Sequence, residues 1–203
     1  MKKTLVVGLF GLMVAHIGGC AFGTRHPILT YTPITKSDAP KNISILVEDF
    51  RDERIDKNVI GHVRNGYGFK TADVVTETNI AQWVTDALKA ELGNNGYIVV
   101  KDRVDLSTQG EILSVYCDSL ALYEGKIDLE VSFKKNDQVI FERKYRGSAS
   151  NMNWAATSNG YGTTLQNTLQ ETMKQIITDI NNKVGEMNPT IPVVDAVAPA
   201  QGA

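Results

Sequence analysis

Hydrophobic positions change their spacing along the chain, and each change marks an expected element. The run ISILVEDF at 43–50 is short and aliphatic, which is typical of a buried strand. From Asn79 onward, apolar residues recur every three or four positions, which predicts an amphipathic helix that Gln82 helps to cap and Gly93 ends. Its apolar face comprises Ile80, Trp83, Val84, Ala87, Leu88 and Leu92.

The second half of the chain predicts four more strands and a last helix. GYIVV at 96–100 and EILSVYCDSLALY at 111–123 are followed by the strictly alternating KIDLEVSF at 126–133 and, after a turn, by QVIFERKYRGSA at 138–149. The last helix carries one apolar stripe of Leu165, Leu169, Met173, Ile176, Ile177, Ile180 and Val184. The expected fold class is α+β: a single antiparallel-rich sheet in the order β-α-β-β-β-β-α, with both amphipathic helices packed on one face.

This pattern also predicts the core. The residues expected inside are Ile45, Val47, Trp83, Leu88, Ile98, Leu129, Val131, Phe133, Phe141, Ile176 and Ile180.

The six prolines divide the chain into domains. All of them fall before residue 41 or after residue 187, and proline fits neither a central strand nor a helix interior. We therefore expect an α+β domain at 41–187, a tether at 20–40 and a disordered tail at 188–203. PILTYTPI at 27–34 is apolar enough to lie along the domain as an edge strand.

The first nineteen residues have the features of a secretory signal peptide. A positive start with Lys2 and Lys3 precedes an apolar run that is shorter than the ~20 residues of a membrane span. Ile17-Gly18-Gly19-Cys20 resembles the lipobox of bacterial lipoproteins, and the alternative is an ordinary signal peptide with an incidental cysteine. The resemblance implies cleavage before Cys20, three acyl chains on it, and membrane anchoring. Ala21, where an aspartate commonly retains such proteins in the inner membrane, implies the periplasmic face of the outer membrane.

Composition excludes several function classes. The formal net charge of -2 provides no basic field for nucleic acid, and two cysteines give no disulfide framework. His62 is the only histidine of the expected domain, and its one possible thiol partner, Cys117, falls on the apolar side of a strand, as buried structural thiols do. The spacing of a zinc site is missing, so no metal and no cofactor are expected.

The segment EDFRDERIDK at 48–57 combines five acids with three bases. Paired carboxylates there would suit a hydrolase acting on peptidoglycan. However, interleaved cations keep carboxylates ionised, which favours a salt-bridged loop.

A short motif that occurs twice in the chain indicates a candidate binding surface. Asn-Gly-Tyr-Gly occurs within 64–71 and again within 158–165, each time between a predicted strand and a predicted helix. We expect the two loops to form one patch that binds a protein or peptidoglycan partner; the alternative is that their aromatic residues only cover helix ends. The candidate residues are the aromatic Tyr67, Phe69, Trp154 and Tyr161 and the surrounding Arg51, Arg54 and Arg64.

The chain resembles the YajG family of outer-membrane lipoproteins. The matching features are the lipobox, DERIDKNVIG at 52–61, ELGNNGY at 91–97, KYRGSAS at 144–150 and the final amphipathic helix. The family has no established catalytic residues, so the resemblance implies a non-enzymatic binding or envelope-organising role. A subunit role in a flagellar or secretion ring and, less favoured, peptidoglycan hydrolysis are the alternatives.

Overall fold

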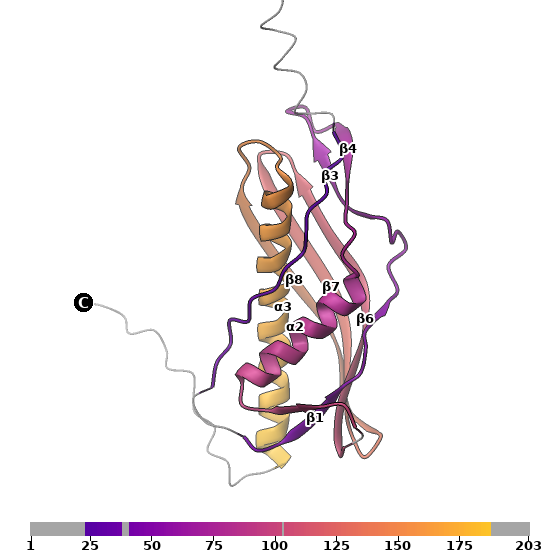
Figure 1. The fold of residues 1–203 in the computed structure, drawn as a ribbon, viewed down its shortest axis with the longest axis vertical. Coiled ribbons are helices and arrows are strands. Elements are labelled where there is room, and N and C mark those ends of the chain that lie inside the picture. Colours follow the sequence, from indigo (N-terminus) through magenta and orange to yellow (C-terminus); the bar gives the residue numbers. More distant parts are fainter. Residues whose placement is uncertain (1–22, 38–40, 103, 188–203) are drawn as a thin grey trace, which may run out of the picture.

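Three long antiparallel strands form the main part of the sheet (Figure 1). The computed structural model describes residues 23–37, 41–102 and 104–187. The turn between the second and third strands has positive φ angles of 48° and 63° at Asn136 and Asp137, as a tight hairpin requires, which confirms the expected hairpin. The strands are β6 (Leu106–Ser119), β7 (Leu122–Lys135) and β8 (Gln138–Met152).

The other edge of β6 carries three short parallel strands, one after another. They pair with β6 at 106–108, 111–112 and 117–119, in the order in which they occur along the chain. They are β1 (Ser44–Val47), β2 (Arg51–Asp52) and β3 (Val59–Arg64). β4 (Lys70–Val75) then pairs antiparallel with β3, and β5 (Ile98–Val100) pairs parallel with β1.

The sheet is therefore mixed and has eight strands in the described part of the chain. The α+β class is confirmed, and the longest pairings are antiparallel as expected. The sheet also contains short parallel pairs, and the expected order β-α-β-β-β-β-α is wrong. The observed order has four strands before the first helix, and the sequence pattern predicts only one of them. β2 is two residues long within a charged run, and β3 and β4 are six residues each, so neither periodicity nor length distinguishes them from a loop.

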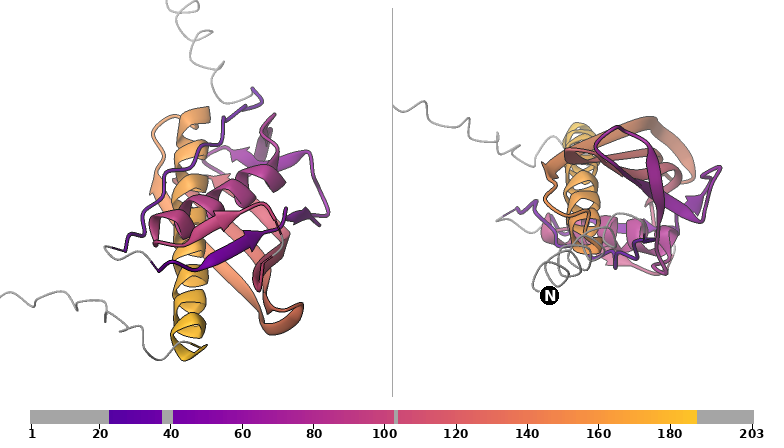
Figure 2. Two further views of the ribbon diagram at one scale, coloured as in Figure 1. Left: turned by 60° about the horizontal axis from the view of Figure 1, so that its bottom comes forward. Right: turned by 90° about the horizontal axis from the view of Figure 1, so that it is seen from above.

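Two helices cover one face of this sheet (Figure 2). α2 (Ile80–Asn94) has Asn79 as its N-cap, whose Oδ1 accepts the N–H of Gln82 at 3.1 Å, and Asn95 as its C-cap, so it ends one residue beyond the expected Gly93. α3 (Ser158–Met187) runs along β7 and β8. No described helix combines the length and the apolar character that crossing a membrane requires.

α3 lies close to the sheet because two sheet positions are glycines. A Cβ at Gly125 would lie 2.2 Å from Thr168 Oγ1, and one at Gly147 would lie 2.1 Å from Thr172 Oγ1. Any side chain at these positions would push the helix away from the strands.

The core confirms most of the predicted positions. Ile98 is an exception at 49% exposure because β5 pairs only with β1 at the margin of the sheet, and Phe141 is only partly buried. The predicted residues that are buried are Ile45, Val47, Trp83, Leu88, Leu129, Val131, Phe133, Ile176 and Ile180.

Residues 23–37, which we call the strap, run across both helices (Figure 1). Trp83 Nε1 donates to the carbonyl of Thr30 at 3.0 Å, Gln170 Nε2 donates to the carbonyl of Thr32 at 2.8 Å, and Leu29 is buried. The expected edge strand at 27–34 is wrong, because the segment bonds to helix side chains instead of a neighbouring strand.

Replacing Trp83 by alanine should lower the free energy of unfolding by about 3–5 kcal/mol, as expected for loss of a buried aromatic ring. The matched control is Trp154→Ala, because Trp154 is 87% exposed and its loss should change stability by less than about 0.5 kcal/mol. Denaturant unfolding measures both. Equal stability of the two variants would contradict the packing of α2.

Candidate functional site

Three loops meet at one end of the molecule (Figure 1). Pairing of Val63 with Ser119 brings the β3–β4 turn next to the β6–β7 turn. Asn153 Nδ2 donates to the carbonyl of Leu120 at 3.2 Å and thereby connects the β8–α3 loop to the β6–β7 turn. The three connections are residues 65–69, 120–121 and 153–157.

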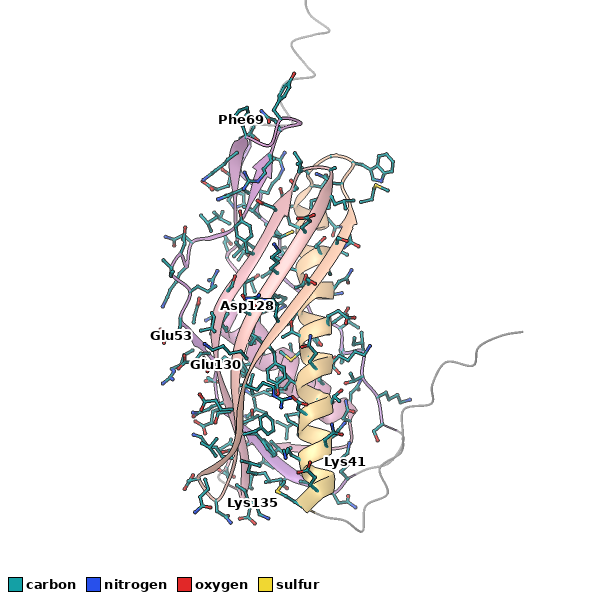
Figure 3. All side chains as sticks on the ribbon, turned by 180° about the vertical axis from the view of Figure 1, so that it is seen from behind. Lys41, Glu53, Phe69, Asp128, Glu130 and Lys135 are labelled. Atoms are coloured by element: carbon teal, nitrogen blue, oxygen red, sulfur yellow. The ribbon has the colours of Figure 1, made fainter. Side chains whose placement is uncertain are left out.

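This end exposes a group of large apolar side chains, which we call the apolar tip. It contains six of the eleven exposed large hydrophobic residues in the described ranges, and Phe69 marks it in Figure 3. Tyr67 and Trp154 are 89% and 87% exposed. Several large apolar side chains exposed at one end of a molecule are typical of an interaction surface, whereas single exposed apolar residues are not. The members are Tyr67, Phe69, Leu120, Leu122, Met152 and Trp154.

Asn65 orders the hairpin turn that carries Tyr67 and Phe69. Its Oδ1 accepts the backbone N–H groups of both aromatic residues at 3.0 Å, and its carbonyl accepts the N–H of Gly68 at 2.8 Å. Gly68 has a φ of 84°, which favours glycine. The two aromatic side chains therefore project from a turn whose backbone bonds are made locally.

The loop that carries Trp154 is held in a similar way. Asn153 Oδ1 accepts the N–H of Ala156 at 2.7 Å, and Tyr123 Oη accepts the N–H of Thr157 at 2.6 Å. The guanidinium of Arg25 donates to the carbonyl of Ala156. The strap is thus bonded directly to this loop.

Part of the predicted patch is brought together here. Tyr67, Phe69 and Trp154 belong to the apolar tip, and Arg64 lies at its base. The Arg64 guanidinium donates to Asp118 Oδ2 at 2.9 Å, which raises the pKa of Arg64, and to the carbonyl of Gly68 at 3.0 Å.

Tyr161, by contrast, is fully buried and does not belong to the patch. Its hydroxyl bonds to Ser119 Oγ and donates to the carbonyl of His62 at 3.1 Å, and burial raises its pKa to about 12. The second Asn-Gly-Tyr-Gly lies in the first turns of α3, whereas the first forms a turn between two strands. The prediction of two equivalent strand-to-helix loops is therefore wrong. Glycine at position 160 is explained by packing, because a Cβ there would lie 2.3 Å from the ring of Tyr123.

Arg51 and Arg54 also lie away from the tip. Arg54 is buried and donates to both carboxylate oxygens of Asp52, at 2.9 and 2.8 Å, and to the carbonyl of Lys57 at 3.1 Å. Burial alone would raise the pKa of Asp52, but the hydrogen bonds and charge of Arg54 lower it below its ordinary value. Arg51 is exposed and bonded to Glu111.

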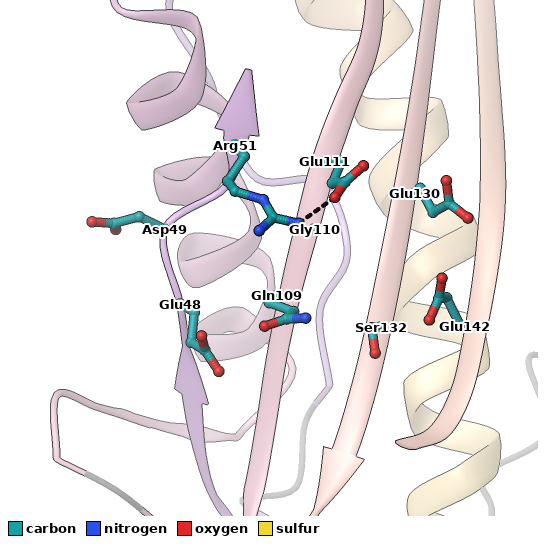
Figure 4. Close-up of a pocket in the computed structure, with 9 residues that line it drawn as sticks. All are labelled: Glu48, Asp49, Arg51, Gln109, Gly110, Glu111, Glu130, Ser132 and Glu142. Atoms are coloured by element: carbon teal, nitrogen blue, oxygen red, sulfur yellow. Dashed lines mark hydrogen bonds and ion pairs between the residues drawn. The ribbon is translucent and has the colours of Figure 1, made fainter. Parts of the chain in front are cut away.

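A hollow of about 340 Å³ lies on the sheet face that turns away from the helices (Figure 4). Its walls are charged or polar, apart from Gly110 at its floor, and both helices lie behind the strands in this view. Nothing in the described ranges groups three His, Cys, Asp or Glu residues so that they could hold a metal ion. The lining residues are Glu48, Asp49, Arg51, Gln109, Gly110, Glu111, Glu130, Ser132 and Glu142.

The acids that the hydrolase alternative requires are not gathered in this hollow. Glu48 and Asp49 line it, but the Asp49 side chain is 91% exposed and points outward in Figure 4. Asp52 is held by Arg54, and Asp56 accepts the backbone N–H groups of the next turn. The charged segment at 48–57 is therefore built from structural ion pairs and turn contacts.

His62 and Cys117 lie on opposite faces of the sheet. His62 pairs with Asp118 in the β3–β6 ladder, and its ring packs edge-on against Tyr116. Cys117 points into the core, and burial raises its pKa to about 12. The expectation of a buried structural thiol is confirmed.

Sequence reasoning missed Glu91, which holds the strap. This carboxylate of α2 is fully buried and accepts the hydroxyl of Tyr31 at 2.6 Å and the backbone N–H groups of Ile34 and Thr35 at 2.8 and 3.0 Å. Burial and the nearby carboxylate raise the pKa of Tyr31. The available signal was an acid at i+3 from Leu88 and next to Leu92, on the apolar face of the predicted helix. Cys20 lies outside the described residues, three positions before the strap begins.

No family model and no curated protein matches the chain, whereas solved structures do. Protein XCC0632 of Xanthomonas campestris, of the DUF330 family, has 15% identity and a TM-score of 0.56 over 81% of this chain and 99% of its own. An uncharacterized protein has 11% identity and a TM-score of 0.51 over 78% and 99%. A minor lipoprotein of Acinetobacter baumannii has 9% identity and a TM-score of 0.43 over 70% and 94%. The first two share the fold, and the resemblance to the YajG family stays a prediction.

Asp52→Asn should reduce stability at neutral pH by about 1–3 kcal/mol, because it removes a charge-assisted pair from a buried arginine. The native pKa of Asp52 is lowered, so its contribution is present above the ordinary value of 3.8 and is lost as pH falls through the native pKa. Urea unfolding at several pH values should show the gap to the parent narrowing below about pH 4. Asp49→Asn, at a 91% exposed side chain, is the control. A gap independent of pH would contradict the pairing.

Glu91→Gln should loosen the strap, because one acceptor and the buried charge are lost. The expected result is faster hydrogen exchange at the amides of Ile34 and Thr35, with a loss of about 1–3 kcal/mol in the free energy that protects them. Glu186→Gln is the control, since Glu186 pairs with Lys183 at the surface and, within the described residues, makes no hydrogen bond or ion pair with the strap. Unchanged exchange at both amides would show that Glu91 does not hold the strap.

Proposed function

We propose that this protein is a lipid-anchored envelope protein that binds a partner and does not catalyse a reaction. The observation that carries the proposal is the position of the lipobox cysteine directly before the strap. Cys20 ends a short apolar run with a basic start, and the strap that crosses the helices begins three residues later, at Gly23. Acylation there would tie the domain to a membrane through a very short connection.

A binding role agrees with the state of the reactive groups. Cys117 is buried with a raised pKa, His62 lies on the opposite face, and Asp52 is kept ionised by Arg54. A nucleophile with an adjacent base, or a carboxylic acid with a raised pKa, would be needed for hydrolysis. We infer that the charged hollow serves recognition instead.

The hollow also suggests the chemistry of the partner. Carboxylates from β6, β7 and β8 face solvent there, and neither α2 nor α3 covers this side of the sheet. Such a face suits amino or guanidinium groups of a protein, or the amino groups of peptidoglycan stem peptides. The proposed location is the periplasmic face of the outer membrane, on the basis of Ala21.

The decisive experiment compares the wild type with Cys20→Ser. Intact-mass measurement should find the wild type acylated at Cys20 and recovered with outer membranes, and the variant unacylated and released from membranes. Ala21→Asp is the matched variant for location, and it should move the acylated protein to the inner membrane. A wild-type protein with a free, unacylated N-terminus would refute the anchor, and wild type in the inner membrane would refute the location.

A further inference from the structure

We propose that the apolar tip is a membrane-docking surface that enters the interfacial layer of the same bilayer that holds the anchor. This inference rests on the proposed acylation of Cys20. It assigns to the tip a lipid surface, where the sequence pattern predicts a protein or peptidoglycan partner.

The direction of the strap places the anchor next to the tip. Arg25 pairs with Val74 in parallel, and its backbone bonds to Asp73 and Val75 at 3.0 and 2.9 Å. β4 begins at Lys70, beside the tip, and runs away from it. Because the strap runs parallel to β4 at Arg25, it also runs away from the tip in the direction of the chain. Followed backward from Arg25 to Gly23, it therefore approaches the tip.

The remaining chain is too short to lead the anchor elsewhere. Cys20 is three residues before Gly23, and three residues span at most about 10 Å when fully extended. Acyl chains on Cys20 would therefore enter the bilayer within about 10 Å of Gly23. The end of the molecule that lies nearest must then face the lipid headgroups.

The side chains at this end suit that layer. All the exposed large aromatic side chains of the described residues belong to the apolar tip. They are Tyr67, Phe69 and Trp154. Tyrosine and tryptophan favour the membrane interface, because an apolar ring enters the acyl boundary while the polar group stays with water and headgroups. Leucine and methionine at the neighbouring positions add apolar area.

The backbone of the tip also suits a layer with little water. Unsatisfied N–H groups are costly there. Asn65 takes up the N–H groups of Tyr67 and Phe69, and Asn153 takes up that of Ala156. The turns can thus present aromatic side chains without presenting these amides.

Trp154 provides the test, since Trp83 is buried and the chain has only two tryptophans. The acylated full-length mature protein is bound to vesicles of phosphatidylethanolamine and phosphatidylglycerol, with and without brominated acyl chains. We expect the Trp154 contribution, taken as wild type minus Trp154→Phe, to shift to shorter wavelength on binding and to be quenched by bromine. Trp154 is 87% exposed, so the Trp154→Phe substitution that this difference requires should not disturb the fold.

Ile55 offers a matched reporter away from the tip. It is fully exposed in the loop between β2 and β3, and Ile55→Trp in the Trp154→Phe background should stay unquenched by bromine and open to aqueous acrylamide. If Trp154 of the acylated, vesicle-bound protein is also unquenched by bromine and open to acrylamide, the docking proposal is refuted. The lipid anchor would still stand, and the apolar tip would then be a surface for a protein partner. If intact mass shows no acyl chain on Cys20, the anchor and the docking proposal fail together.

Discussion

The architecture depends on β6 being paired along both edges. One edge pairs with β7 along its length, with one irregularity between Ile112 and Ser114, while the other pairs in turn with β1, β2 and β3, each in parallel. Because β1, β2 and β3 follow one another in the same direction along β6, the chain needs no crossover connection between them, and only short irregular segments separate the three contacts. At the third contact, a Cβ at Gly61 would lie 1.9 Å from the carbonyl oxygen of Cys117, so only glycine permits β3 to reach β6. β6 thereby fixes the distance between the charged hollow at its middle and the apolar tip at its end.

Much of this fold could be predicted from the sequence, because the long elements bury regular faces. The stripes of α2 and α3 and the alternation of β7 repeat over enough residues to stand out from chance. The short parallel strands could not be predicted in this way. β2 exists because Arg51 and Asp52 lie opposite Glu111 and Ile112, and a contact between positions sixty residues apart leaves no local periodicity.

The candidate site was predicted in part, for a related reason. Aromatic residues in the loops around the Asn-Gly-Tyr-Gly motifs predicted a surface, and Tyr67, Phe69 and Trp154 are indeed exposed. The same reasoning fails for Tyr161, because the glycines around it serve helix packing and leave its hydroxyl to bond inside the core. Glu91 was missed although the sequence shows an acid on an apolar helix face. Such an acid needs hydrogen-bond donors, and the strap provides them through its backbone amides.

With Cys20 acylated as proposed, the attachment of the strap would also set the height of the domain above the membrane. α3 contains 30 residues and extends along the long axis of the molecule from the tip toward the opposite end, a length of about 45 Å (Figure 1). A domain joined to its anchor by a flexible linker would sample many heights above a membrane surface. Under the proposed anchoring, a domain whose linker is bound across its own helices would keep one depth and one orientation, with the β7–β8 turn at the end away from the membrane. Anchored in this way, the domain would hold whatever it binds at a set distance from the bilayer.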